Sequence, residues 1–176
     1  MIEEADLPLP GDFRTFHPFI KGVFSQWHPA GFELGGRQFV TAEQWMMVQK
    51  AELFEDHVRA EAIMRASDPA EQKRQGQQVA AFDQALWDAC KLDIVYRGSL
   101  AKFEQNPGAL RQLLNTGDAM LVEANPRDWI WGIGLAINDP AVHQPVLWRG
   151  ANLLGRILTR VRQRLAIYPN RPHAKA

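Results

Sequence analysis

Residues 120–134 read Met-Leu-Val-Glu-Ala-Asn-Pro-Arg-Asp-Trp-Ile-Trp-Gly-Ile-Gly, and this stretch contains the strongest structural signal in the chain. Its first part, residues 120–122, is apolar at every position, which is typical of a strand buried on both faces. Its second part places Asp128, two tryptophans and two glycines within seven residues. Indole rings are costly in an exposed turn, and glycine lets the backbone approach a flat ligand. We therefore expect a buried strand that ends at a pocket for a planar heterocycle.

The composition favours one globular domain without a metal centre. With 176 residues, 46% of them hydrophobic, the chain has enough apolar surface for one core. Twenty lysines and arginines balance twenty aspartates and glutamates, which argues against a nucleic-acid coat but allows a local basic spot for one phosphate. Cys90 is the single cysteine, and the five histidines lack close metal-ligand spacing. We expect no disulfide framework, no metal and no cofactor.

The two ends of the sequence differ from its middle. The first residues show no signal peptide, and no apolar run reaches membrane-spanning length, so we expect a cytoplasmic protein without a membrane partner. Residues 1–12 are acidic and rich in proline, and we expect them to be irregular. Residues 13–167 are expected to form the single domain, and residues 168–176 a loose C-terminal tail.

Turn and capping signals divide the domain into helices and short strands, which predicts an α+β class that is predominantly helical. Residues 13–24 alternate weakly, as a strand does, but Pro18 interrupts them, and Gly35-Gly36 between two short apolar runs indicates a hairpin. Thr41 with Gln44 has the spacing of a capping box. Helices are predicted from 42 to about 65, from 69 on to about 103, from 107 to 114 and from 153 to 165.

The helix that begins after Thr41 has an unusual face. Glu43, Met46, Met47 and Lys50 lie on one side of it by helical spacing. In the ordinary interpretation Glu43 complements the helix dipole and Lys50 extends into solvent. Alternatively, the two charges hold the ends of a ribose phosphate, with the carboxylate at the anomeric carbon and the ammonium at the phosphate. Their positions are about 10.5 Å apart along the helix axis.

Aromatic and amide side chains supply candidate walls for the pocket. Trp87 lies among helical core positions, where an indole is more often core than ligand wall. Trp27 occupies a loop position before Pro29, where an exposed ring needs something to cover it. Beside it, Gln26 has the amide groups that read the edge of a base.

Each polar group near the Trp-Gly run has two interpretations. Asp128 caps the turn after Pro126 or acts chemically, and we favour the chemical role because indoles would exclude water and strengthen its field. Glu123 acts in the pocket or pairs with a buried arginine. Residues 148–152, with Arg149 before the last helix, form either an anion site or an ordinary helix start with a surface arginine.

Many separate motifs occur in an order that resembles the NADAR family, also called YbiA-like. The resemblance runs from about Phe24 to Leu165 and rests on Phe24–Trp27, Thr41–Ala51, Lys73 with Gly76, Lys102–Asn106, Leu121–Ala124, Asp128 with Trp131–Gly134, and Trp148 with Gly150 and Asn152–Gly155. It implies a YbiA-like single domain and the hydrolysis of N-glycosidic bonds to ribose. Implied substrates are the ribosylamino-pyrimidine phosphates of riboflavin synthesis in some members, and ADP-ribosylated guanine or related NAD metabolites in others.

The resemblance also assigns roles to residues. It implies an active site of Glu43, Trp87, Asp128 and Trp131, with Gln26, Lys50 and Asn152 as binders. Joined to the residues singled out above, the predicted site has Glu43 and Asp128 as catalytic groups and binds substrate through Gln26, Trp27, Lys50, Trp87, Trp131, Gly132, Arg149 and Asn152. Relatives often carry arginine where this chain has Gln77, so phosphate recognition here departs from the family pattern.

The expected function is that of an N-glycosidase. Cleavage of a ribosyl C–N bond builds positive charge on the sugar, which nearby carboxylates stabilise. Either Glu43 or Asp128 is expected to activate water at the anomeric carbon, and the other to assist the departing base. The expected partner is a small ribosylated base or nucleotide, or an ADP-ribosylated nucleic acid. The alternative is a non-catalytic module that binds ADP-ribose or a related nucleotide.

Overall fold

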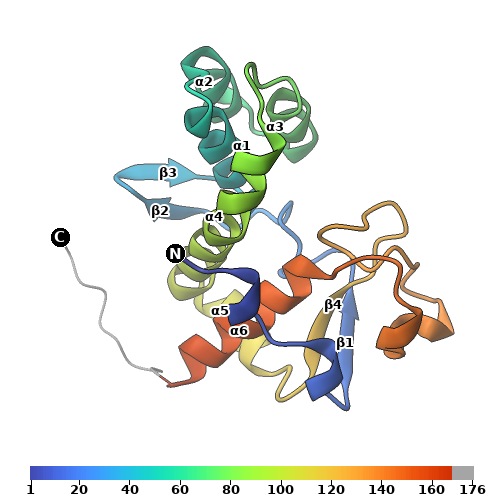
Figure 1. Cartoon of the computed structure of the whole chain (residues 1–176). Coiled ribbons are helices and arrows are strands. Elements are labelled where there is room, and N and C mark those ends of the chain that lie inside the picture. The colour runs from blue at the N-terminus through green and yellow to red at the C-terminus, as the bar shows by residue number, and fades with distance from the viewer. Residues whose placement is uncertain (168–176) are drawn as a thin grey trace.

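We analysed a computed structural model, which describes residues 1–167; the predicted tail at 168–176 lies outside the described residues. The predicted class is confirmed, since six α-helices and four short strands make up most of its regular structure (Figure 1). In chain order the elements are η1 (Glu4–Asp6), η2 (Pro10–Asp12), β1 (Phe16–Phe19), β2 (Phe32–Leu34), β3 (Arg37–Phe39), α1 (Ala42–Leu53), α2 (His57–Arg65), α3 (Pro69–Gly76), α4 (Gln84–Gln105), α5 (Pro107–Leu114), β4 (Met120–Glu123), η3 (Pro140–His143), η4 (Pro145–Leu147) and α6 (Leu153–Ile167).

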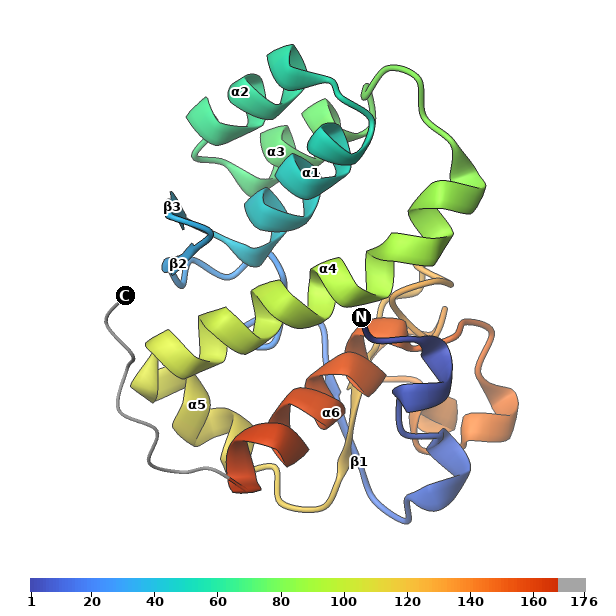
Figure 2. The ribbon, with the colours of Figure 1, turned by 60° about the vertical axis from the view of Figure 1, so that its left-hand side comes forward.

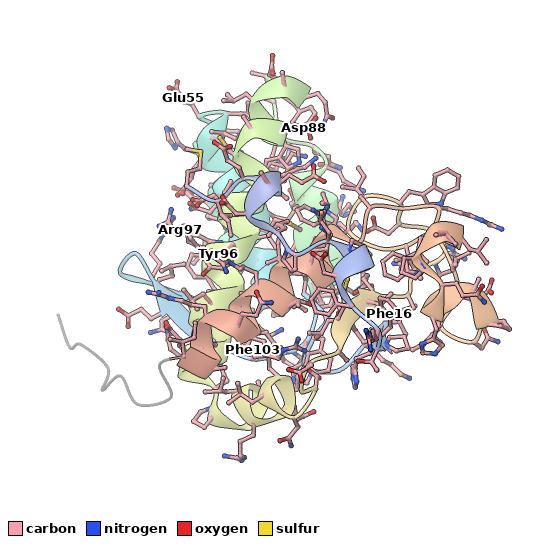
Figure 3. All side chains as sticks on the ribbon, turned by 60° about the horizontal axis from the view of Figure 1, so that its bottom comes forward. Phe16, Glu55, Asp88, Tyr96, Arg97 and Phe103 are labelled. Atoms are coloured by element: carbon pink, nitrogen blue, oxygen red, sulfur yellow. The ribbon has the colours of Figure 1, made fainter. Side chains whose placement is uncertain are left out.

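The long helix α4 runs through the middle of the molecule. Helices α1, α2 and α3 gather on one side of it, and α6 with the β1–β4 pair lies on the other (Figure 2). Phe103 near the end of α4, labelled in Figure 3, is fully buried within the main core. Both α1 and α6 pack on α4, so this helix joins the α1–α3 side of the molecule to the side that contains α6 and the β1–β4 pair.

The predicted strands form two separate pairs. β2 and β3 form the predicted antiparallel hairpin, and Gly35 and Gly36 have φ values of 62° and 74°, which a two-residue turn of this kind requires. β1 pairs in parallel with β4, with Phe16 opposite Met120. Pro18 lies inside β1 and does not break it, because β1 has a single strand neighbour and needs no N–H on its other edge.

Two helices that the sequence predicts as continuous are each divided. α1 ends at Leu53, Glu55 (labelled in Figure 3) has a φ of 57°, and the side chain of Asp56 accepts a hydrogen bond from the Arg59 N–H to begin α2. Between α3 and α4, Ala81 has a φ of 52° and Asp83 caps the new helix through the Leu86 N–H. In both places an internal aspartate restarts the helix.

The first twelve residues are more ordered than expected. They form two 3-10 turns, and Leu7 between these turns is only 3% exposed. Arg156 of α6 donates hydrogen bonds to the Glu4 carboxylate and to the carbonyl of Pro8. Burial and hydrogen bonding thus fix this segment on α6. Within residues 1–167, no helix has the length and apolar character needed to cross a membrane.

Gly155 allows α6 to lie directly on β4. A Cβ atom at this position would come 2.1 Å from the carbonyl oxygen of Leu121, which is main chain and has little room to shift. We expect Gly155→Ala to lower the free energy of unfolding by about 1–3 kcal/mol, the usual cost of overpacking, as measured by urea denaturation. In the matched control Gly108→Ala in α5, the nearest atom to the new Cβ is a side-chain atom of Arg111 at 3.9 Å. This control should keep or slightly raise stability, and equal losses in both variants would contradict the packing argument.

Candidate active site

A cavity of about 610 Å³ opens where the loop before β2, the helices α1, α3 and α4, and the segment after β4 meet. The predicted catalytic pair, Glu43 and Asp128, both line this cavity, although they are far apart in the chain. Its lining residues are Ile20, Lys21, Ser25, Gln26, Trp27, Glu43, Met46, Met47, Lys50, Lys73, Gln77, Trp87, Glu123, Asn125, Asp128, Ile130, Trp131 and Leu154. Of the ten predicted site residues, seven are present in this lining and three are not.

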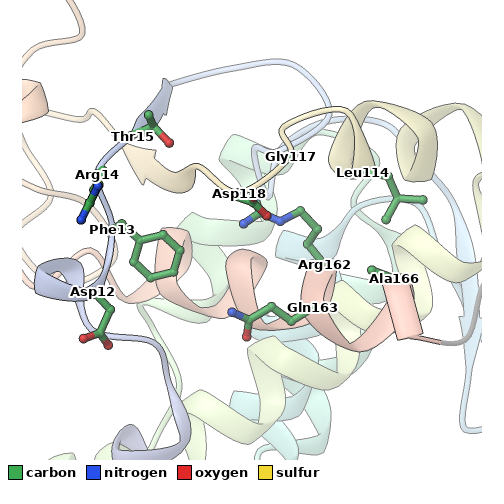
Figure 4. Close-up of a pocket in the computed structure, with 10 residues that line it drawn as sticks. All are labelled: Asp12, Phe13, Arg14, Thr15, Leu114, Gly117, Asp118, Arg162, Gln163 and Ala166. Atoms are coloured by element: carbon green, nitrogen blue, oxygen red, sulfur yellow. The ribbon is translucent and has the colours of Figure 1, made fainter.

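A second hollow of about 630 Å³ lies elsewhere on the molecule, between the N-terminal segment, the loop before β4 and the end of α6 (Figure 4). Its side chains include Asp118 and Arg162, and it contains none of the predicted site residues. The Nη1 atom of Arg162 is already engaged, because it donates to the Thr116 hydroxyl and to the carbonyl of Ala119. The first cavity is therefore the candidate active site.

Glu43 enters the cavity from the first turn of α1. Thr41 caps this helix, and the Glu43 N–H donates to the carbonyl of Gln26 at 3.0 Å, which ties the Gln26–Trp27 loop to the helix start. Burial raises the pKa of Glu43 to about 7; Lys73 and a hydrogen bond from Trp27 oppose this rise, and Asp128 adds to it. The Oε1 atom of Glu43 is buried without a hydrogen-bond partner in the described part of the chain. This oxygen is available to a ligand.

Glu123, the last residue of β4, is a third acid in the cavity. Its residue surface is 8% exposed, and burial, together with the charge of Asp128, raises its pKa to about 8 against the opposing effect of Lys73. The buried-arginine alternative is not realised, since no arginine within residues 1–167 forms an ion pair with it and its Oε2 atom has no hydrogen-bond partner. The sequence left its role open because an acid after a strand fits both interpretations.

Asp128 caps its turn, and its carboxylate also belongs to the cavity. Its Oδ1 atom accepts hydrogen bonds from the N–H groups of Ile130 and Trp131, at 3.0 and 2.8 Å, so the residue does cap its turn. It also lines the cavity, and its charge raises the pKa values of both Glu43 and Glu123. Capping fixes the carboxylate where it acts electrostatically on the other two acids.

Lysines and aromatic rings complete the lining. The Nζ atom of Lys50 lies 4.4 Å from the Phe82 ring centroid and 5.7 Å from that of Trp87, and burial lowers the pKa of Lys50. The Nζ atom of Lys73 lies 5.9 Å from the Trp27 ring. Lys73 lines the cavity, although it is not among the site residues predicted from the sequence. The one indication in the sequence was that Lys73 belongs to the family motif with Gly76. With Lys21, the cavity lining thus contains three lysines beside its three acids.

Asn152, predicted to bind substrate, has a structural position instead. It is fully buried, with Oδ1 accepting from the Glu123 N–H and Nδ2 donating to the carbonyl of Leu121, each at 3.0 Å. Its φ of 52° is unusual for a residue other than glycine. The side-chain amide therefore pairs with the edge of β4 as a neighbouring strand would, and no part of Asn152 lines the cavity.

Arg149 and Gly132 also lie outside the cavity lining. Arg149 is exposed, and the expected anion site at the start of α6 is not formed, because the N–H groups of Asn152, Leu153 and Leu154 already donate to carbonyls of residues 130–132. At Gly132 a Cβ atom would come 2.9 Å from the carbonyl oxygens of Asp128 and Glu123, so this glycine serves a close backbone approach. Trp129 is 59% exposed, and Trp131 is the indole of the run that faces the cavity.

No ligand set for a metal ion is evident in the part of the chain that the structure describes, where no group of three or more His, Cys, Asp or Glu side chains is suitably placed. Among the three acids of the cavity, Asp128 acts through its charge on Glu43 and on Glu123. Two of them hold protons more tightly than a free carboxyl group does. Neighbouring acids with perturbed pKa values are typical of sites of acid–base catalysis.

Comparison with known proteins identifies relatives along nearly the whole chain. The model of the NADAR domain matches residues 13–166. An N-glycosidase of Acanthamoeba polyphaga mimivirus is 42% identical over 146 residues, which cover 80% of this chain and 86% of the relative. A riboflavin biosynthesis protein of Vibrio vulnificus is 29% identical over 82% of this chain and 35% of its own length. The NMR structure of Escherichia coli YbiA superposes with a TM-score of 0.74 at 28% identity, covering 93% of this chain and 92% of that one.

The burial of Glu123 predicts a pH-dependent gain in stability for Glu123→Gln. Below pH 4.5 the carboxyl group is protonated in both states, so glutamine changes little. As the pH rises from 4.5 to about 8, the unfolded chain ionises freely while the folded protein keeps the proton, so the wild type loses stability. We expect the variant to gain about 1–3 kcal/mol over this window, as measured by urea denaturation between pH 4 and 9. The control Glu104→Gln, at an exposed position of α4, should follow the wild type throughout. A gain that does not grow with pH would contradict the prediction.

Proposed function

This chain belongs to the NADAR family, and on that basis we propose that it hydrolyses the N-glycosidic bond between ribose and a nitrogenous base. The observation that carries the proposal is the meeting of Glu43 and Asp128 in one cavity with indole rings and lysines. The ribosyl group carries a phosphate or belongs to ADP-ribose. Candidate substrates are a ribosylamino-pyrimidine phosphate of riboflavin biosynthesis and ADP-ribosylated guanine, free or in nucleic acid.

The proposed reaction depends on the charges of the two acids. As the C1′–N bond breaks, positive charge develops on the ribose, and the carboxylate of Asp128 stabilises it. Glu43 removes a proton from the attacking water, a role that suits a group with a pKa of about 7 near neutral pH. The buried Oε1 atom of Glu43 supplies the acceptor for that water.

The remaining lining residues match the two ends of such a substrate. Trp87 and Trp131 offer flat apolar surfaces for a base, and Trp27, 42% exposed, lies at a solvent-accessible part of the cavity lining. Lys50 and Lys73 offer two ammonium groups for phosphate oxygens. These contacts would serve a non-catalytic nucleotide-binding module equally well, so the distinction between the two functions requires a chemical measurement.

The acids are tested by removing their charges one at a time. Glu43→Gln and Asp128→Asn keep the side-chain shape, and each should lower the rate of base release by about 10²–10⁴, the usual contribution of one acid–base group. Base release is followed by chromatography with ribosylamino-pyrimidine phosphate, NAD, ADP-ribose and ADP-ribosylated guanine. Glu104→Gln is the control and should retain the wild-type rate. Tight binding of a ligand that stays intact in the wild type would favour the binding module, and wild-type rates in both acid variants would end the proposal.

The two neighbouring tryptophans provide a matched pair for substrate binding. Trp131 lines the cavity and Trp129 does not. We expect Trp131→Leu to raise KM or Kd about 5- to 150-fold, because a stacked ring contributes about 1–3 kcal/mol per base. Trp129→Leu should leave both constants unchanged. Isothermal titration with a non-hydrolysed analogue measures the effect, and equal losses in the two variants would rule out specific stacking on Trp131.

A further inference from the structure

Resting on the proposed hydrolysis, we propose that Glu123 is a further catalytic residue, the acid that protonates the departing base. Hydrolysis at the ribose needs two proton transfers, one from the attacking water and one to the nitrogen that leaves. Glu43 and Asp128 account for the water and for the sugar charge. Among the acids that line the cavity, Glu123 remains for the leaving nitrogen.

The surroundings of Glu123 match a group that waits for a substrate. Its carboxyl group is buried, yet the Oε2 atom has no hydrogen-bond partner in the described structure. A buried polar atom without a partner is costly, so such atoms are uncommon outside functional sites. A nitrogen of a base bound in the cavity would supply the missing partner.

The backbone around Glu123 holds it in place with two specialised residues. The Oδ1 atom of Asn152 accepts from the Glu123 N–H at 3.0 Å, and Asn152 adopts a φ of 52° that few residues tolerate. At Gly132 a Cβ atom would come 3.2 Å from the Cγ atom of Glu123 and 2.9 Å from its carbonyl oxygen. Asn152 thus fixes the main chain of Glu123, and Gly132 leaves room for its carbonyl group and Cγ atom.

Burial, together with the charge of Asp128, keeps Glu123 protonated at neutral pH. Asp128, from the loop after β4, repels a negative charge on it, and Lys73, from α3, attracts one. Glu43, from α1, lines the same cavity and has the lower pKa, about 7 against about 8. Both raised pKa values lie near neutral pH, where an acid and a base can exchange protons. The unpartnered Oε2 atom of Glu123 and its place in the cavity assign it the role of the acid beside the base Glu43.

The proposed step balances in atoms and charge. The C1′–N bond breaks with its electron pair on nitrogen, and Glu123 transfers its carboxyl proton to that nitrogen. Water forms the new C1′–O bond and gives a proton to Glu43. The products are the free base with one added hydrogen and the ribose with a hydroxyl group. Solvent then returns a proton to Glu123 and removes one from Glu43, and the enzyme is restored.

The decisive variant is Glu123→Gln, which keeps the shape and an N–H donor but has no proton to transfer. We expect kcat for base release to fall by about 10²–10³ while KM stays within about threefold of the wild type. We expect kcat/KM of the wild type to fall above pH about 8, where Glu123 loses its proton, and this fall should be absent in the variant. Glu123→Asp keeps a transferable proton on a shorter side chain and should recover part of kcat, which a purely structural role would not require.

The outcomes separate this proposal from the function on which it rests. If the wild type releases base and Glu123→Gln retains its kcat and the decline above pH 8, Glu123 is not the acid and hydrolysis by Glu43 and Asp128 stands. If the wild type releases no base from any substrate of the panel, the proposed hydrolysis and the role of Glu123 both fall. Urea denaturation of Glu123→Gln serves as the folding control, so that a loss of kcat in a folded variant is not mistaken for a loss of folded protein.

Discussion

The structure depends on how the buried backbone of β4 is satisfied. β4 is buried along its whole length and has β1 on one edge alone. Its other edge is paired by side chains of α6, with the Thr159 hydroxyl accepting from the Leu121 N–H and the Asn152 amide spanning Leu121 and Glu123. Buried N–H and carbonyl groups need partners, so the helix replaces a missing strand. This pairing brings α6 so close to β4 that only a glycine fits at position 155.

The same arrangement fixes the chemistry of the cavity. Because β4 cannot shift relative to α6, Glu123 stays beside the turn that Asp128 caps, and the acids remain near each other without a neutralising arginine. Burial of these groups opposes folding, since each would be better solvated in the unfolded chain. The core around α4 offsets this cost. Burial of Glu43 and Glu123 thus lowers the stability of the folded protein and at the same time raises their pKa values toward neutral pH.

The sequence predicts those elements that depend on interactions between residues close together in the chain. The Gly35-Gly36 turn, the Thr41 cap and the apolar run of β4 were all predictable, and so was the convergence of Glu43 and Asp128 once the family order of motifs was recognised. The breaks at residues 54–56 and 77–83 were not, because good helix formers surround them and the capping role of Asp56 depends on a positive φ at the residue before it.

Tertiary contacts decided the other residues of the site. Asn152 is an amide beside a helix start, and its sequence gives no sign that both of its polar atoms face a strand. Arg149 lies just before a helix, where an arginine and free backbone N–H groups often bind an anion. Here the N–H groups at the helix start already donate to the carbonyls of residues 130–132. Glu123 and Lys73 are charges whose importance depends on which groups face them across the cavity.

The parallel pairing of β1 with β4 has a consequence for biosynthesis. Phe16 leaves the ribosome long before its partner Met120, and α6, which completes the free edge of β4, is made after both strands. Helices α1 to α5 contact one another through local segments and can associate during translation, whereas the long-range pairing cannot. A chain that ends before Asn152 therefore contains α1 to α5 but lacks the side chains that pair the free edge of β4 and the Leu154 side of the cavity.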